Sequence, residues 1–258
     1  FTGLFTFGDG ESRNLAYTIA LSRNNTAVNP IFPTSGSNFT ISGKFTPPYS
    51  LFTDTDFGDL ENQPEYQDKQ GNPLRDKIDQ EKFRWLEYYK IKFVGDWYTK
   101  VVGKLILRTQ EEFGFLGTYN SDRGNIPFER FFLGGDGMAT YALDGRENIA
   151  LRGYENQSLS SRDGSTIYNK LTTELRYPIT LKPSASIYAL SFLEAGDGYD
   201  SFRAFNPFQA KRSAGAGIRI FMPAFGLLGI DFGYGFDNAT GGTTPSGWQT
   251  HFIIGQQF

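Results

Sequence analysis

The sequence contains no cysteine and only one histidine, His251, among its 258 residues. Without cysteine the chain cannot form a disulfide, use a thiol nucleophile or bind a metal through sulfur. A single histidine does not supply the sets of side chains that catalytic triads and histidine-ligated metal sites use. We therefore expect no enzymatic activity, no cofactor and no metal site.

Long apolar runs are missing as well. No stretch of about 18 apolar residues occurs, so no transmembrane helix is expected. The opening residues FTGLFTFGDG lack the basic region of a signal peptide. The net charge is only −3 and both signs are interspersed, so no nucleic-acid partner is expected.

Aromatic residues and glycine are abundant by contrast. Aromatics make up 16% of the chain, with 25 Phe and 14 Tyr, and there are 30 Gly. The mean hydropathy is nevertheless −0.40. A transmembrane β-barrel combines these properties, because it exposes apolar and aromatic residues to lipid and encloses polar residues in its lumen.

Apolar and polar residues alternate along several segments. In LLGIDFGYGFD, residues 227–237, leucine, isoleucine and aromatics occupy the even positions from 228, whereas glycine and aspartate occupy the odd positions from 229. A strand separates these two classes onto opposite faces, and a helix would mix them. We expect nine strands, over residues 14–22, 38–46, 82–93, 101–112, 168–179, 185–194, 211–220, 227–237 and 248–258.

The connections between these segments alternate in length. The short ones contain NPIFPTSG, LKPS and MPAFG, and the long ones cover residues 47–81, 120–166, 195–210 and 238–247. Outer-membrane barrels have short periplasmic turns and long extracellular loops, so the short connections predict the periplasmic side. Single-chain bacterial barrels use an even number of strands. Nine strands therefore suggest the C-terminal portion of a larger barrel, as one domain over residues 1–258, or a tenth strand near Phe1–Phe7.

Five motifs occur in order along the chain: NPIFPTSGSNFTISGKFT at 29–46, PFERFFLGGDGMA at 127–139, LRGY at 151–154, SFLEAGDGY at 191–199 and HFIIGQQF at 251–258. In order and spacing they resemble the Omp85 superfamily of outer-membrane assembly and translocation barrels, especially its BamA-type assembly factors. The resemblance covers essentially the whole chain. Two regions depart from the familiar members: an insertion at 139–150, before LRGY, and a long acidic loop after Pro47.

The resemblance implies an all-β fold: a transmembrane antiparallel β-barrel, here about the last nine of sixteen strands, without the periplasmic POTRA domains. It implies an integral protein of the bacterial outer membrane that folds and inserts other outer-membrane proteins. The implied partners are membrane lipid, nascent outer-membrane proteins and accessory Bam-type lipoproteins, and the long loops could bind surface-exposed subunits. A secretion transporter, a Tam-like paralogue and a passive diffusion channel remain as alternatives.

Within the LRGY motif, the resemblance gives a role to the arginine. In the family this loop folds into the barrel and its arginine meets acidic residues on the inner wall. Carried over, Arg152 should meet Glu174 and Glu194, which the alternation places on polar faces of their strands. The alternative is a solvated loop arginine. The motif comprises Leu151, Arg152, Gly153 and Tyr154.

Two further sets of residues are expected in the barrel wall. The last strand carries Phe252, Ile254, Gly255 and Phe258, and the resemblance makes it a β-signal that pairs weakly with the first strand and forms a lateral gate. Alternatively, this strand is only the protein's own insertion signal. Basic residues on polar faces should line the lumen: Lys90, Lys92, Arg108, Lys170 and Arg176. His251 also lies on a polar face by parity.

Overall fold

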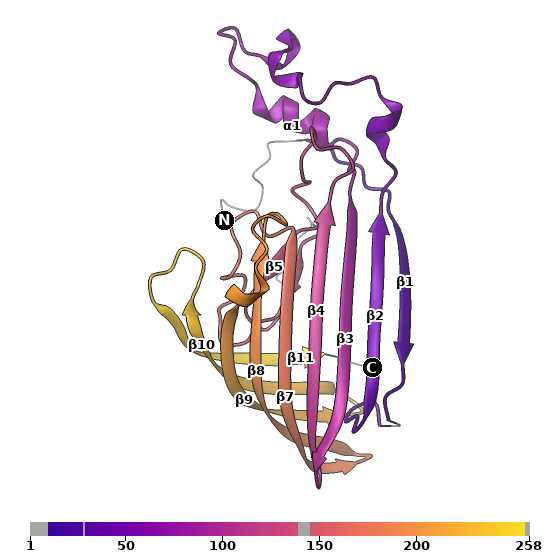
Figure 1. Ribbon diagram of the computed structural model, residues 1–258, viewed down its shortest axis with the longest axis vertical. Helices are drawn as coiled ribbons and strands as arrows, with labels where there is room; N and C mark the ends of the chain where they lie inside the picture. The colour runs from indigo at the N-terminus through magenta and orange to yellow at the C-terminus, as the bar shows by residue number, and fades with distance from the viewer. Residues whose placement is uncertain (1–9, 28, 139–144, 256–258) are drawn as a thin grey trace. The chain divides into compact units, whose positions relative to one another are not determined.

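The computed structural model describes residues 10–27, 29–138 and 145–255 (Figure 1). Nine strands form one sheet in the order β1-β2-β3-β4-β7-β8-β9-β10-β11, and two short strands form a second sheet, β5-β6. From β4 onward the pairs of the large sheet are antiparallel. The predicted all-β class and the antiparallel sheet of nine strands are confirmed. No helix in the described residues is long and apolar enough to cross a membrane.

The strand bounds agree best with the ranges predicted from the sequence in the C-terminal half of the chain. The large sheet consists of β1 Tyr17–Asn24, β2 Gly36–Phe45, β3 Tyr89–Val102, β4 Leu105–Gly117, β7 Ile167–Lys182, β8 Ala185–Tyr199, β9 Lys211–Met222, β10 Gly226–Asn238 and β11 Pro245–Gly255. The small sheet consists of β5 Phe131–Leu133 and β6 Glu147–Ile149. The sequence did not indicate β5 and β6. The possible tenth strand near Phe1–Phe7 lies outside the described residues.

Two predicted strands were misplaced. The segment 82–93 was expected to be a strand, but residues Arg75–Phe83 form helix α1 and β3 begins only at Tyr89. The next strand was expected from residue 101, whereas β3 continues to Val102 and β4 begins at Leu105. Apolar residues lie on both sides of the tight turn between these strands, at Val101 and Val102 and at residues 105–107, so the pattern did not reveal it. Gly103 in this turn has φ +56°, which glycine adopts readily.

The chain divides into two compact units. Unit 1 comprises residues 1–19, 43–91 and 116–127, and unit 2 comprises residues 20–42, 92–115 and 128–258. The expectation of one barrel domain over the whole chain remains a prediction. In unit 1, α1 is accompanied by the 3-10 helices η1 Tyr49–Phe52, η2 Leu60–Asn62 and η3 Pro64–Tyr66. Phe57, Leu60 and Ile78 form its buried cluster.

Strand β7 of unit 2 shows why these segments form a two-sided wall. Leu171, Leu175 and Tyr177 are 40–52% exposed on one face. The opposite face is buried and polar, and it carries Lys170, Thr172, Glu174 and Arg176. Alternate residues of a strand point to opposite faces, so the sequence pattern alone creates an apolar outside and a charged inside.

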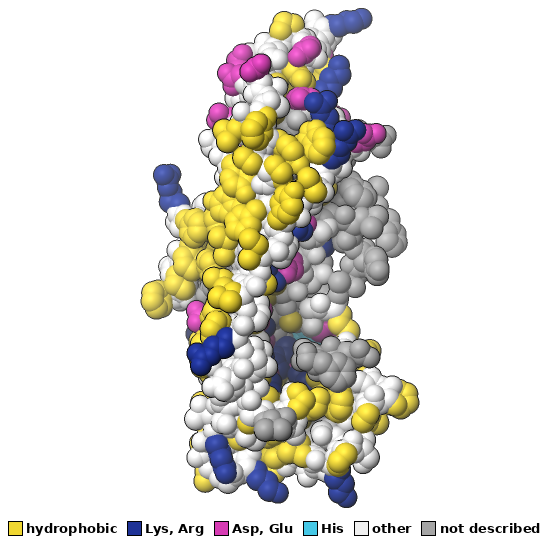
Figure 2. Space-filling view, turned by 90° about the vertical axis from the view of Figure 1, so that its right-hand side faces the viewer, with side chains coloured by type: hydrophobic (Ala, Val, Ile, Leu, Met, Phe, Trp, Pro, Cys, Tyr) yellow, Lys and Arg dark blue, Asp and Glu magenta, His cyan; other side chains and the backbone are white. Residues whose placement is uncertain are grey.

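Apolar side chains are also exposed along β1, at one end of the strand order. Tyr17, Ile19 and Leu21 are 60%, 70% and 66% exposed. Figure 2 shows the side of the molecule that carries this strand, with hydrophobic side chains gathered on it. Water does not favour such a surface over a whole strand, whereas lipid does.

The turn NPIFPTSG contributes a buried aromatic residue. Phe32 is 1% exposed and joins Ile106, Tyr188, Leu190 and Phe192 in the apolar cluster of unit 2. Its ring meets that of Tyr188 edge-on, with centroids 5.3 Å apart. This short turn therefore packs into the sheet's interior side instead of projecting into solvent.

Candidate functional site

The connection between β4 and β7 builds its own scaffold before it reaches LRGY. Strand β5 pairs in parallel with β6. The amide of Phe131 donates to the carbonyl of Ser165, and Gly135 and Leu151 exchange backbone hydrogen bonds of 3.1 Å in both directions. Phe131, Leu133 and Leu151 are 0% exposed. These bonds and buried side chains fix the backbone at the entrance to the motif.

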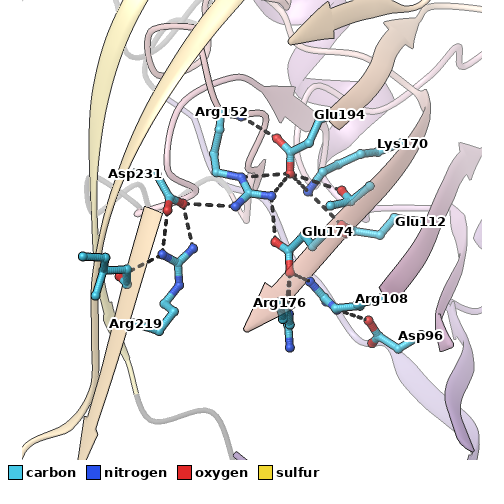
Figure 3. Close-up of polar contacts among 12 residues, drawn as sticks. Asp96, Arg108, Glu112, Arg152, Lys170, Glu174, Arg176, Glu194, Arg219 and Asp231 are labelled. Atoms are coloured by element: carbon cyan, nitrogen blue, oxygen red, sulfur yellow. Dashed lines mark hydrogen bonds and ion pairs between the residues drawn. The ribbon is translucent and has the colours of Figure 1, made fainter. Parts of the chain in front are cut away.

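Arg152 lies in a cage of three carboxylates (Figure 3). Its Nη2 atom is 2.8 Å from Oε1 of Glu174 and 2.7 Å from Oε1 of Glu194. Its Nη1 atom donates to Oδ2 of Asp231 at 3.1 Å. The structure thus brings Arg152 together with the two glutamates named from the sequence, and adds an aspartate that the sequence analysis did not assign.

The backbone and the flat face of Arg152 are also engaged. Its amide donates to Oε2 of Glu194 at 2.7 Å while its Nε atom donates to Oε1 of the same carboxylate at 3.0 Å. The guanidinium carbon lies 3.7 Å from the centroid of the Phe192 ring. A planar fork of donors that also stacks on an aromatic ring is specific to arginine, and lysine cannot reproduce it.

The cage belongs to a larger charged network in unit 2. Glu174 also accepts from Arg108 and Arg176, at 3.2 and 2.8 Å. Asp231 binds both terminal nitrogens of Arg219, at 2.6 and 2.7 Å. Five basic residues (Arg108, Arg152, Lys170, Arg176, Arg219) are linked with five carboxylates (Asp96, Glu112, Glu174, Glu194, Asp231), so their formal charges cancel.

The charge balance depends on the loop. Nine of these ten residues lie on strands β3, β4, β7, β8, β9 and β10, and only Arg152 comes from the loop. Burial opposes the charge of Arg152, but Glu194 and Glu174 outweigh it and raise the pKa of this guanidinium above its usual value. Without Arg152 the wall would hold five carboxylates against four cations in a buried setting.

The backbone of Gly153 lies directly against the backbone of the wall. Its φ is +88°, and a Cβ at this position would lie 2.9 Å from the amide nitrogen of Gly235. A Cβ on Gly233 would lie 2.7 Å from the nitrogen of Gly153, and one on Gly235 would lie 2.3 Å from its oxygen. Real Cβ atoms do not approach so closely, so glycine is needed on both sides of this contact.

Tyr154 completes the motif by binding backbone groups. Its hydroxyl donates to the carbonyl of Arg212 at 2.6 Å and accepts from the amide of Asp237 at 3.3 Å. Burial raises the pKa of Tyr154 to about 12, so the phenol stays protonated and can donate. The motif therefore binds strands β7, β8, β9 and β10 through Arg152 and Tyr154, while Gly153 packs against β10.

Comparison with known proteins places this geometry in a family. The model of the Omp85 superfamily domain matches residues 7–258. The chain belongs to the Omp85 superfamily. Membership implies an outer-membrane β-barrel, and the loop bound inside the strands is part of this Omp85 domain.

One similar solved structure is BamA from Haemophilus ducreyi lacking POTRA domains 1–3, with a TM-score of 0.60 and 17% sequence identity. The match covers 92% of this chain but 41% of that chain, so this Omp85 domain spans less than half of the solved structure's length. At this identity the likeness shows a shared fold. No curated protein matches the sequence.

The last strand of this Omp85 domain pairs with β10 over its described length. Phe252 and Ile254 are 56% and 69% exposed on the outward face. A Cβ added to Gly255 would have no neighbour within 4 Å. Phe258 lies outside the described residues. In the strand order, β11 and β1 are the two ends of the sheet.

Two contributors were missed by the sequence analysis, although parity placed both on polar faces. Asp231 is 0% exposed and binds Arg152 and Arg219. His251, on β11, accepts from the amide of Gly153 at its Nε2 atom over 2.9 Å. Their face could be read from the alternation, but their distance from the loop could not.

The basic residues expected in the lumen have specific partners. Arg108, Lys170 and Arg176 belong to the charged network, and Lys92 pairs with Glu147 of β6. Lys90 is 6% exposed. A polar cavity of about 430 Å³ adjoins Arg152 and is lined by charges of both signs. In the described part of the chain, no group of three or more His, Cys, Asp or Glu side chains is arranged so that it could hold a metal ion. The arrangement can hold a loop by ion pairs.

Proposed function

We propose that this Omp85 domain folds and inserts other outer-membrane proteins through a lateral opening at its last strand, without covalent chemistry or a cofactor. The observation that carries the proposal is the insertion of Arg152 among the carboxylates of three strands. A loop fastened in this way braces the wall next to the last hairpin. A passive diffusion channel needs no such brace.

The edge strand supports the lateral opening. An unpaired strand edge presents backbone donors and acceptors that an incoming strand can use, and insertion then buries the apolar face of the new strand in lipid. Strand β11 ends the sheet order and carries the outward-facing Phe252 and Ile254. Gly255 has no side chain to pack near the end of this strand, which weakens it locally.

The proposed setting is the bacterial outer membrane, where the domain would be an integral part of a longer barrel. The proposed partners are nascent outer-membrane proteins, membrane lipid and accessory lipoproteins of the Bam type. Unit 1, which carries the long acidic loop, is a candidate for binding surface-exposed subunits. A pull-down with and without residues 47–81 tests that last partner directly.

The function can be tested by depletion. The native gene is placed under a repressible promoter and complemented with the wild type, with Arg152→Ala, or with Arg203→Ala, which removes an exposed arginine from the β8–β9 loop. The outer-membrane proteome is then quantified. We expect Arg203→Ala to behave as wild type and Arg152→Ala to lower the amounts of many unrelated barrels and reduce viability.

A different pattern of losses would contradict the proposal. Loss of a single secreted protein, with the other barrels at normal amounts, would identify a dedicated secretion transporter. Unchanged amounts of all barrels, with the Arg152→Ala protein present and folded, would remove the role assigned to the anchored loop.

A further inference from the structure

The loop tip meets the last two strands of the sheet at one point. Asp231 of β10 and His251 of β11 are directly opposite each other in the antiparallel register. Both are buried on the inner face, with exposures of 0% and 5%. They bind consecutive residues of the loop: Asp231 accepts from Arg152 at 3.1 Å, and His251 accepts from the amide of Gly153 at 2.9 Å.

Glycines on β10 allow the loop backbone to come close enough to the strand for this arrangement. Gly233 and Gly235 of β10 lie directly beneath Gly153, and a side chain on either would collide with it. The loop backbone therefore lies against β10 and reaches β11 through one hydrogen bond. The acceptor must be the unprotonated Nε2 atom of the imidazole, which places the ring proton on Nδ1.

We infer that the loop tip is a staple across the last hairpin, in which His251 is a positioning residue that fastens β11 to Gly153. The hydrogen bond joins β11, the strand proposed to border the lateral opening, to a loop that is fixed to β7, β8 and β10 by ion pairs. Any movement of β11 away from this loop must break the bond. The inference deepens the proposed function. It rests on that function only in linking a movement of β11 to the insertion of other proteins.

The amide of Gly153 itself reports the staple. Hydrogen exchange resolved to single amides is measured on the purified, folded full-length protein and on three variants. His251→Leu keeps bulk and removes the acceptor, His251→Gln retains a long side chain with an acceptor oxygen, and Thr250→Val changes the exposed outer face of the same strand. The adjacent amide of Arg152, which donates to Glu194, serves as an internal reference.

We expect His251→Leu to speed exchange at Gly153 by roughly tenfold, because a buried amide loses its acceptor. Exchange at Arg152 should change far less, and His251→Gln should restore most of the protection at Gly153. Thr250→Val should leave both amides as in the wild type. A merely structural role would raise exchange at both amides together and would not be rescued by glutamine.

Two results would overturn the inference: unchanged exchange at Gly153 in His251→Leu, or an equal rise at Gly153 and Arg152. If His251→Leu does not fold, His251→Asn replaces it, since its shorter side chain cannot reach Gly153 but remains polar. The measurement does not use assembly activity, so failure of the proposed function would leave it intact. Failure of the staple would likewise leave the depletion experiment unaffected.

Discussion

Each unit has a buried arginine that comes from a connection between strands, and these two arginines differ in how they are neutralised. Arg152 in unit 2 and Arg123 in unit 1 are 6% and 5% exposed. Arg152 meets three carboxylates, whereas Arg123 forms an ion pair with Glu87 at 2.6 Å and donates to the backbone carbonyls of Lys82 and Trp85. The first binds strands of a wall, and the second binds the segment after β4 to the end of α1 and the residues before β3.

Equal burial therefore produces opposite electrostatic results. Burial lowers the pKa of Arg123, and the attraction of Glu87 does not fully offset this. For Arg152 the same burial is outweighed by Glu194 and Glu174, and its pKa is raised. The comparison indicates that the three carboxylates around Arg152 outweigh the burial of its guanidinium, whereas the attraction of Glu87 does not outweigh the burial of Arg123.

Removing Arg152 should have the largest effect. Arg152→Ala leaves Glu174, Glu194 and Asp231 with one cation too few, and breaking a buried pair in this way costs about 3–5 kcal/mol. The measurement is the denaturant midpoint of the heat-resistant folded band on electrophoresis. Arg152→Lys should recover only part of the loss, since an ammonium cannot match the fork geometry. A midpoint equal to that of the wild type would contradict the claim that Arg152 contributes more to stability than Arg123.

Removing Arg123 should have a smaller and local effect. Glu87 still accepts from the amide and hydroxyl of Ser50, at 2.7 and 2.8 Å, so it is not left without partners. We expect Arg123→Ala to destabilise unit 1 by about 1–3 kcal/mol. Limited proteolysis within residues 47–88 should accelerate while the heat-resistant band of the barrel persists. Loss of the band as well would show that unit 1 supports the rest of the chain.

An exposed ion pair in unit 1 should give the smallest effect on stability. Arg84 and Glu81 are 3.6 Å apart, with side chains 55% and 26% exposed. Glu81→Ala should change the free energy of unfolding by no more than about 0.5 kcal/mol, because water and salt screen such pairs. The same proteolysis assay applies. An effect as large as that of Arg123→Ala would mean that burial does not account for the difference.

Much of unit 2 could be predicted from the sequence, because period-2 alternation specifies which side chains face inward. This placed Glu174 and Glu194 on the polar face, and the resemblance of LRGY supplied their partner. Asp231 and His251 were on the correct face too, but their contacts depend on how far the loop penetrates the wall. That depth is set by Gly233 and Gly235, whose small size allows an approach that no local pattern encodes.

The structure of unit 1 was predicted less well, because its local sequence carries little periodic signal. Helix α1 lies in a segment with charged residues throughout, and its one buried residue, Ile78, contacts Phe57 and Leu60 across an irregular loop. A helix with so few apolar positions gives no periodic signal. In unit 2, the short strands β5 and β6 were missed because three residues are too few to show alternation.

The dispersed origin of the carboxylates around Arg152 has a consequence for the order of folding. Glu174, Glu194 and Asp231 come from three strands, so the full set of acceptors exists only after β7 to β10 have paired in register. A slip of one strand by one residue would turn its carboxylate to the opposite face. Arg152 can therefore bind its full set of carboxylates only when these strands are already paired in the correct register.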